Sequence, residues 1–268
     1  MTELITMHTH STFCNHAKDP LGDMVQAAVD AGIAHMAATE HYPIPDELDP
    51  SKRSTMPAER LEAYIDAVRE QQKRDDIDVL LGCELDWLGK DETRALRASD
   101  FDRFDVVLGS IHFVDRWLMV SHKNMSRWKS VDLEAFWNRY VELWCEAAKS
   151  DMPFTVMAHA DVVKKFSPKP EFDLEPLYER MARAAREGGR MVEVNTSGAY
   201  AECAEYYPSP SLLQAFRAEG VACTVGTDAH CKEHIARDIE RAYDYMRAAG
   251  YTQLAVPTRG RGVRMVDL

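Results

Sequence analysis

The sequence predicts an α/β fold in which short parallel strands alternate with helices. Seven short apolar runs recur along the 268 residues, and helical patterns of apolar residues separate most of them. Strands that are apolar on both faces are typical of a parallel sheet covered by helices. Such a sheet forms either an open, doubly wound structure or a closed barrel. The G-x-G-x-x-G loop that would favour dinucleotide binding on an open sheet is absent after the first run.

The predicted strands are the seven apolar, β-prone runs. They cover residues 4–8, 35–40, 78–84, 105–111, 154–158, 190–195 and 221–227. Runs of this length without polar alternation are expected in buried strands. We therefore expect all seven to belong to one parallel sheet.

The predicted helices have identifiable starts, apolar faces and stops. Asp19 and Pro20 supply a cap and a first helical residue, and Gly32 closes this first helix. Apolar residues at i, i+3, i+4 and i+7 predict two more helices, one beginning near Leu61 and one over residues 132–149. Further helices are predicted at residues 173–187, 209–219 and 233–249. Trp137 and Trp144 are expected to pack in the core.

Length and composition favour one cytoplasmic domain that covers residues 1–268. A single α/β barrel uses about 250 residues, and the chain contains no internal repeat, low-complexity tract or linker. Its contents of 46% hydrophobic and 28% charged residues are typical of globular proteins. No apolar run approaches the roughly 18 residues needed to cross a bilayer, and the N-terminus lacks signal-peptide features. We therefore expect no membrane partner.

The net charge and the cysteine spacing argue against a nucleic-acid-binding protein and against a fold held by disulfides or by zinc bound to thiolates. A net charge of −12 repels a polyphosphate backbone, so we expect no nucleic-acid partner. A small phosphorylated substrate stays compatible, because clustered divalent cations reverse the local field. The six cysteines are scattered without a C-x-x-C pair, which argues against a disulfide framework or a thiolate zinc site.

Polar side chains that can bind metals follow the predicted strands. They are His8, His10, His41, Glu84, His112, His159, Asn195, Asp228 and His230. Because the carboxyl ends of the strands of a parallel barrel meet at one face, we expect these side chains to converge there. Six of the ten histidines belong to this set, and a seventh, His16, lies in the loop after the first strand. His35, His122 and His234 lie outside the pattern.

The number of these side chains predicts more than one metal ion. Seven imidazoles and at least two carboxylates exceed the three or four ligands of a single zinc site. Mixed nitrogen and oxygen ligands suit Zn, Mn or Fe, and the sequence does not choose among them. Cys14 and Cys231 flank the ligands, but we do not expect a sulfur ligand.

The motifs around these residues resemble those of the PHP (polymerase and histidinol phosphatase) family, most closely its stand-alone histidinol-phosphate phosphatases. The matching stretches follow the family's order: H-T-H-S-T-F-C-N-H-A (8–17), T-E-H-Y (39–42), L-G-C-E-L-D (81–86), V-L-G-S-I-H-F-V (107–114), A-H-A-D-V-V-K-K-F (158–166), V-E-V-N-T-S-G (192–198) and G-T-D-A-H (226–230). The resemblance implies a distorted (β/α)7 barrel and a single PHP-type metal-dependent hydrolase domain.

The resemblance also implies three divalent metal ions with assigned ligands. His8, His10, Glu84 and Asp228 would hold one ion, and Glu84 would bridge to a second ion held by His112 and His159. His16, His41 and His230 would hold the third. All nine positions carry ligating side chains in this chain.

The activity implied by the resemblance is hydrolysis of L-histidinol phosphate to L-histidinol and phosphate. In this hypothesis a metal-bridging hydroxide attacks phosphorus, and Glu84 and Asp228 hold the catalytic ions. His41, Asp161 or a metal-bound water would protonate the leaving alkoxide. Asn195, Lys164 and Lys165 are the candidate substrate-binding residues. Ser11 and Cys14 lie near the site, but neither has a dedicated base, so a covalent nucleophile is not supported.

Two departures from the family pattern keep other functions open. Glu40 replaces the usual Asp before the second-strand histidine, and residues 199–207 (A-Y-A-E-C-A-E-Y-Y) replace a basic stretch that helps to hold phosphate. The second departure weakens the assignment of histidinol phosphate. The alternatives are another small phosphate ester, such as a sugar or nucleoside phosphate, a phosphodiester, or a metal-binding protein without catalysis.

Overall fold

The main sheet of the protein consists of seven parallel strands. The computed structural model describes residues 2–49, 54–90 and 98–268. The strand order is β1-β2-β3-β4-β7-β8-β9, and every neighbouring pair is parallel. The strands are β1 (Leu4–Thr6), β2 (Ile33–Ala38), β3 (Asp78–Asp86), β4 (Val106–Ser110), β7 (Val156–Met157), β8 (Met191–Asn195) and β9 (Cys223–Gly226). Each of the seven predicted strands is therefore present.

The first and last strands of this sheet meet through backbone hydrogen bonds. Met7 N donates to Val225 O at 2.8 Å, and Asp228 N donates to His8 O at 2.8 Å. Thr9 and Ala229 form a parallel bridge just beyond the strands. The sheet is thus nearly closed, which confirms the predicted distorted (β/α)7 barrel and rules out the open arrangement.

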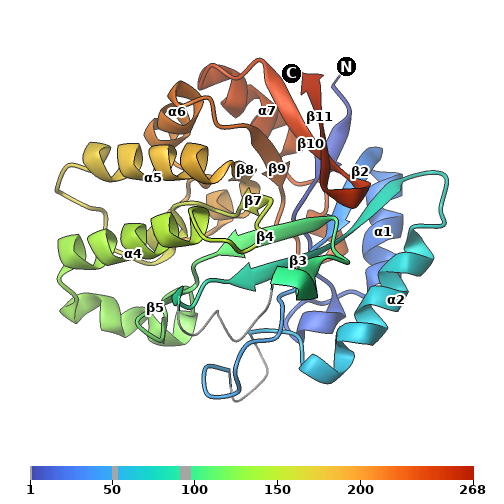
Figure 1. Ribbon diagram of the computed structural model, residues 1–268, viewed down its shortest axis with the longest axis horizontal. Helices are drawn as coiled ribbons and strands as arrows, with labels where there is room; N and C mark the ends of the chain where they lie inside the picture. Colours follow the sequence, from blue (N-terminus) through green and yellow to red (C-terminus); the bar gives the residue numbers. More distant parts are fainter. Residues whose placement is uncertain (1, 50–53, 91–97) are drawn as a thin grey trace.

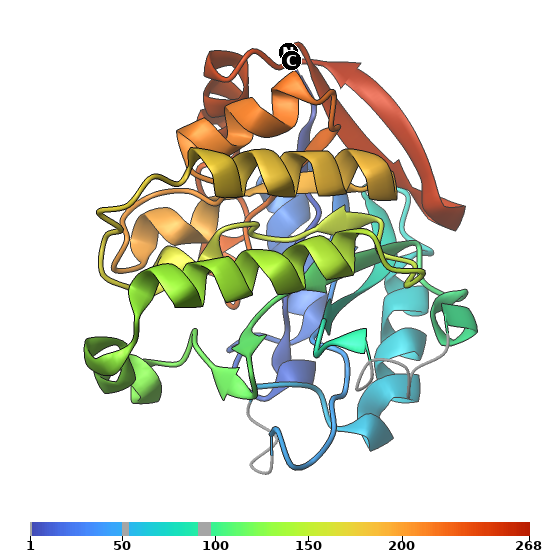
Figure 2. The ribbon, with the colours of Figure 1, turned by 60° about the vertical axis from the view of Figure 1, so that its left-hand side comes forward.

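Helices lie between the strands and cover the outside of the barrel. Within the described residues the α-helices are α1 (Leu21–Asp30), α2 (Leu61–Gln71), α4 (Leu133–Ala148), α5 (Glu175–Gly188), α6 (Pro210–Ala218) and α7 (Ile239–Ala248). Helices α4, α5 and α6 pack side by side on one flank, and α1 and α2 lie on the other (Figures 1 and 2). None of the described helices combines the length and the apolar character needed to span a membrane.

One predicted helix, residues 233–249, begins later than expected. The α-helix starts at Ile239, and Lys232–His234 form a separate short 3-10 turn. Asp238 causes the break, because its φ of 61° lies in the left-handed region that a right-handed helix excludes. The aspartate side chain tolerates this conformation better than most others.

Two antiparallel hairpins stand apart from the main sheet, and neither was predicted. The small one pairs β5 (Phe113–Val114) with β6 (Trp117–Leu118) just after His112. The larger one pairs β10 (Gln253–Thr258) with β11 (Gly262–Asp267) and brings the two chain termini together (Figure 1). Thr2 Oγ1 donates to Asp267 O at 3.2 Å across this contact.

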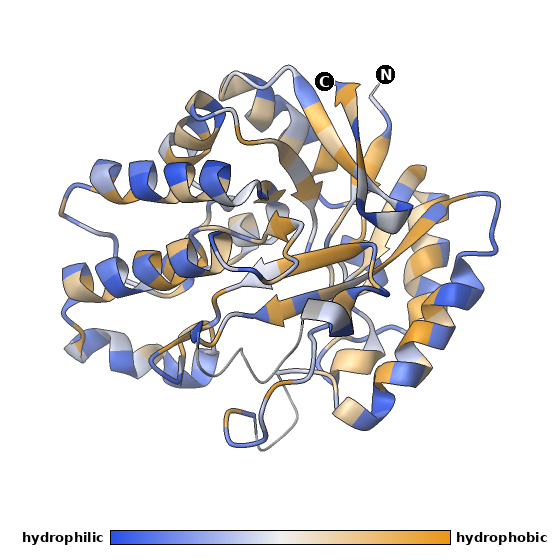
Figure 3. Cartoon of the chain, viewed as in Figure 1, coloured by the Kyte–Doolittle hydropathy of each residue, from blue (hydrophilic) through white to orange (hydrophobic). Residues whose placement is uncertain are grey.

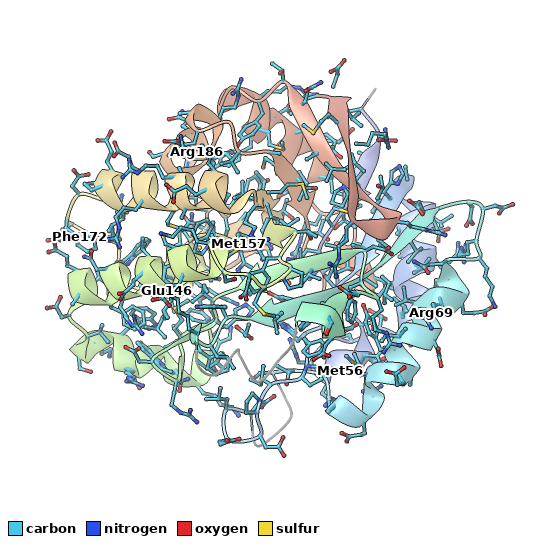
Figure 4. All side chains as sticks on the ribbon, in the orientation of Figure 1. Met56, Arg69, Glu146, Met157, Phe172 and Arg186 are labelled. Atoms are coloured by element: carbon cyan, nitrogen blue, oxygen red, sulfur yellow. The ribbon has the colours of Figure 1, made fainter. Side chains whose placement is uncertain are left out.

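The core fills the space inside the barrel and under the helices. Strands are hydrophobic along most of their length, whereas each outer helix alternates a hydrophobic and a hydrophilic face (Figure 3). Met157 of β7 is fully buried, whereas Arg69 and Arg186 project from α2 and α5 (Figure 4). Trp137 and Trp144 are each only 1% exposed, which confirms their predicted core positions.

Candidate metal centre

Glu84 lies at the centre of a cluster of histidines at the carboxyl ends of the strands. One of its carboxylate oxygens, Oε1, is 2.9 Å from His159 Nε2 and 3.5 Å from His112 Nε2. The other, Oε2, contacts imidazole nitrogens of His8, His10 and His41 at 3.3, 3.4 and 2.9 Å. One buried carboxylate thus contacts side chains that follow four different strands.

Asp228 and His230, which follow β9, extend this cluster. Asp228 Oδ1 lies 3.3 Å from His10 Nε2 and 3.7 Å from His8 Nε2. His230 Nε2 lies 2.9 Å from His16 Nε2, which belongs to the loop after β1. All nine predicted metal ligands therefore come together at one face of the barrel.

The donor atoms of this cluster fit divalent cations. Five sets each place three ligand atoms within 4.8 Å of one another, and among them are His8 with His10 and Asp228, His8 with Glu84 and His159, and His16 with His41 and His230. Imidazole nitrogens face each other, at 3.1 Å between His8 Nε2 and His10 Nε2. Glu84 Oε2 is buried without a hydrogen bond to any part of the chain that the structure describes. A shared cation satisfies all of these lone pairs at once.

Solvent reaches this cluster mainly at His16, Asp228 and His230. His8, His10, Glu84 and His159 are buried, with at most 2% of each residue exposed. The side chains of Asp228 and His230 are 18% and 30% exposed. Among the described residues, the edge formed by His16, Asp228 and His230 is the most open approach for a substrate, and the side chains of His41 and His112 are each only 11% exposed.

The pKa values of the cluster show how strongly its groups interact. Burial alone would raise the pKa of Glu84, but the surrounding histidines, led by His41, His8 and His112, hold it well below its usual value. Partial loss of solvent and the neighbours His41 and His230 lower the pKa of His16 to about 3. The carboxylate is thus ionised and this imidazole neutral, as metal coordination requires.

Several of the histidines are oriented by an oxygen that holds their second nitrogen. His112 Nδ1 lies 3.1 Å from Asp86 Oδ1, and His8 Nδ1 lies 2.9 Å from Glu193 Oε1. Backbone oxygens do the same for His16 and His230, each at 2.9 Å from Nδ1. Such contacts turn the other nitrogen of each ring towards the metal position.

Asp86 and Glu193 were missed by the sequence analysis, although each leaves a signal. Asp86 lies two residues after Glu84 on β3, so strand alternation puts the two on the same face. Glu193 is the one carboxylate inside the apolar run of β8, and it is fully buried. A charged residue in such a run needs a partner.

The backbone is strained at two of the ligands. His159 and Asp228 adopt φ values of 24° and 51°, which residues other than glycine rarely adopt. Backbone strain of this kind costs roughly 1–3 kcal/mol per residue and is concentrated at functional sites. It is consistent with a site whose ligand directions are fixed by the surrounding fold.

Lys164 and Asp161, predicted for substrate binding and catalysis, contact each other. Lys164 Nζ lies 3.0 Å from Asp161 Oδ2, 2.6 Å from Glu205 Oε2 and 2.8 Å from Tyr206 O. These partners match the three donors of an ammonium group. Asp161 is fully buried and also accepts a hydrogen bond from Ser209 N at 2.8 Å. The pair anchors the acidic stretch 199–207 to the barrel.

The remaining candidates have other surroundings. Asn195 is fully buried, and its side chain donates to Glu193 and accepts from Ser197 N. Lys165 is half-buried, and its ammonium lies 5.5 Å from the centre of the Phe166 ring. Cys14 lies within 4.8 Å of ligand atoms of His10 and His230, but burial raises the pKa of its thiol, which donates to Ser11 O.

Comparisons with known proteins agree on the family and the fold. The PHP domain matches residues 6–197. A protein of Deinococcus radiodurans named "Probable histidinol-phosphatase" is 31% identical over 233 residues, which are 86% of this chain and 87% of that protein. A protein of Schizosaccharomyces pombe with the same name is 24% identical over 278 residues, covering 96% of this chain and 90% of that protein.

A solved structure shares the fold over nearly the whole chain. It is the histidinol phosphate phosphatase from Lactococcus lactis, complexed with zinc, L-histidinol and phosphate. It superposes with a TM-score of 0.81 at 19% sequence identity and covers 98% of this chain and 99% of its own.

Proposed function

The chain belongs to the PHP domain family and is a phosphoric monoester hydrolase, and on this premise we propose that it hydrolyses L-histidinol phosphate in a metal-dependent reaction. The observation that carries the proposal is the gathering of seven imidazoles and the carboxylates of Glu84 and Asp228 at one face of the barrel. The similarity to proteins named histidinol-phosphatases supports the substrate. We propose that residues 1–268 act as one hydrolase domain.

The proposed ligands would hold three divalent ions, of Zn, Mn or Fe. They are His8, His10, Glu84 and Asp228 for one ion, Glu84, His112 and His159 for a second, and His16, His41 and His230 for a third. When bound, such ions neutralise the phosphate charge and acidify the attacking water.

The charges of the chain's own residues make these cations necessary for binding the substrate phosphate. Glu84 and Asp228 are both held ionised, because nearby histidines outweigh the effect of burial on their pKa values. A phosphate dianion that approaches them is repelled, and bound cations reverse the sign of this field. The substrate would enter along the exposed edge of His16, Asp228 and His230. Its phosphate would then face the cluster, and its organic part would face solvent.

The proton for the leaving alkoxide is proposed to come from solvent water at this exposed edge. Asp161 is buried and already bonded to Lys164 and Ser209. His41 lies among the ligands, 2.9 Å from Glu84, where its lone pair is needed for coordination. We therefore assign neither residue as the general acid.

The test is a comparison of substrates with the metal-loaded protein. Release of inorganic phosphate is measured with L-histidinol phosphate, with sugar and nucleoside monophosphates, and with a bis-aryl phosphate diester. We expect the highest kcat/KM for L-histidinol phosphate. A higher kcat/KM for another monoester would show that L-histidinol phosphate is not the preferred substrate. Hydrolysis of the diester alone would overturn the monoesterase proposal.

A further inference from the structure

We propose that Glu193 is a positioning residue that holds His8 in the tautomer whose Nε2 can bind a metal ion in the cluster. The inference rests on the proposed function in one respect, because it takes the cluster to be a metal centre. It goes further by assigning a task to the hydrogen-bonded chain Glu193, Asn195 and Ser197, which lies behind the ligands.

Glu193 is a fully buried carboxylate surrounded by nitrogen donors. Its oxygens lie 2.9 and 3.2 Å from His8 Nδ1. Oε2 also accepts hydrogen bonds from His159 N at 3.0 Å and from Asn195 Nδ2 at 3.1 Å. One side chain thus joins His8 to the backbone of His159, a second ligand that follows a different strand.

These contacts decide which nitrogen of His8 carries the proton. A carboxylate accepts hydrogen bonds and does not donate them, so His8 donates from Nδ1. In the neutral ring that binds a metal ion, Nε2 then keeps the free lone pair. This Nε2 faces the centre, 3.3 Å from Glu84 Oε2 and 3.1 Å from His10 Nε2. Contact with Glu193 therefore presents His8 to the metal position.

Gly226 of β9 shows how closely this pair is enclosed. A Cβ atom at position 226 would lie 1.8 Å from Glu193 Oε1 and 2.5 Å from His8 Cβ. No side chain fits at these distances, so the contact between Glu193 and His8 requires glycine at this point of the strand.

The hydrogen-bonded chain continues to a second ligand of the same ion. Asn195 Oδ1 accepts from Ser197 N at 3.0 Å. Ser197 Oγ lies 2.7 Å from Asn195 Oδ1 and 3.2 Å from Asp228 Oδ2, and it donates its single proton to one of them. Asn195, a candidate for substrate binding in the sequence, thereby acquires a different role: it connects the residue behind His8 with the residue beside Asp228.

The direct test is Glu193→Gln, which keeps the shape but changes the hydrogen bonds. If the glutamine oxygen accepts from His159 N and Asn195, its amide group faces His8 Nδ1 and moves the ring proton to Nε2. We expect metal affinity at this position to fall about 10- to 100-fold, as for other residues behind metal ligands. The measurements are metal content by elemental analysis, metal titration, and ¹⁵N NMR of the His8 ring in the metal-free protein at a pH at which the ring is neutral.

Asp49→Asn is the matched control. Asp49 is 3% exposed and accepts from the backbone nitrogens of Ser54 and Thr55. It should alter stability without altering metal affinity. Ser197→Ala, at a half-buried position, is the milder second variant if Glu193→Gln does not fold, and we expect it to weaken metal binding by a smaller factor.

Unchanged metal affinity in the folded Glu193→Gln protein, or in Ser197→Ala where the first variant does not fold, would overturn the proposal. A His8 ring that keeps its proton on Nδ1 in Glu193→Gln would do the same. Because none of these measurements uses a substrate, they stand even if the parent protein hydrolyses no phosphate ester. Failure of the proposed function and failure of this inference are thus separate results.

Discussion

The two ends of the barrel both place histidine beside carboxylates, but with different partners. At the amino end, His35 lies 3.3 Å from Asp78 and 3.4 Å from Glu3. Arginines complete these contacts: Arg259 pairs with Asp78 at 3.0 Å, and Arg264 pairs with Glu3. At the carboxyl end, the ion pairs of Glu84 and Asp228 within the described chain are all with histidines.

The difference indicates that the carboxyl end of the barrel, and not the amino end, needs a bound metal cation. Arginine is permanently charged, so the carboxylates of the amino end are neutralised by the protein itself. An imidazole carries a positive charge only while it is protonated, and it must lose that proton to bind a metal ion, so histidine ligands leave the charges of Glu84 and Asp228 for the metal to neutralise. Burying such charges without compensation is costly. Divalent ions supply the compensation that arginines give at the other end.

The largest expected effect comes from removing a ligand at the carboxyl end. His10→Ala and Asp228→Asn should each lower phosphatase activity by more than about a hundredfold. Substitution of a residue that only supports a metal ligand already lowers metal affinity or activity about 10- to 100-fold. Metal content should fall in parallel. His122→Ala is the control, because its side chain is 74% exposed and contacts none of the ligands. Equal losses in all three variants would show that the site is misplaced.

Removal of the metal should lower stability. An ion that binds the folded chain but not the unfolded chain stabilises the folded state by about 4 kcal/mol when the free metal concentration is 1,000 times the dissociation constant. Thermal unfolding with a chelator should therefore occur well below the temperature measured with added Zn or Mn. Identical unfolding temperatures in the two samples would mean that the carboxyl end needs no cation.

Glu40 lies behind His41 and accepts hydrogen bonds from Ser11 N and Oγ. Burial raises its pKa from 4.5 to about 7. A raised carboxyl pKa stabilises the fold below pH 4.5, and this contribution is lost as pH rises through 7. Converted at about 1.4 kcal/mol per pKa unit, the loss is at most about 3 kcal/mol.

Glu40→Gln removes this pH dependence. Relative to the parent, the metal-free variant should gain unfolding free energy between pH 5 and pH 8, as measured by denaturant titration at both values. A constant difference between variant and parent across this range would refute the assignment.

The smallest effect is expected at the amino end. Arg264 is 46% exposed, and exposed ion pairs contribute about 0–1 kcal/mol. Arg264→Ala should therefore lower the unfolding free energy by less than about 1 kcal/mol and leave metal content and activity unchanged. Loss of bound metal in this variant would break the contrast between the two ends.

The sequence predicted the strands and the convergence of the candidate metal ligands because both follow local rules. Apolar runs mark the strands, and parallel topology sends the residues after them to one face, which is why His8, Glu84, His159 and Asp228 could be grouped. His35 was set apart correctly for the same reason, since it lies at the start of a run and therefore near the other end of the barrel.

Other features depend on contacts that one-dimensional patterns do not contain. Glu193 acquires its role only when β8 pairs with β9 and lies behind His8. Lys164 was a candidate phosphate ligand until the fold placed Glu205, some 40 residues later, beside it. The β10–β11 hairpin was missed although it leaves a local signal, since two β-prone runs, residues 253–258 and 262–267, flank a turn at Gly260.

Anomalous X-ray scattering from crystals of the metal-loaded protein tests the central claim most directly. Data collected at the absorption edges of zinc, manganese and iron locate each bound ion and identify it. The account predicts peaks within coordination distance of Glu84, Asp228 and the seven histidines around them. Crystals that show the side chains in place after metal loading, with no anomalous peak between them, would contradict it.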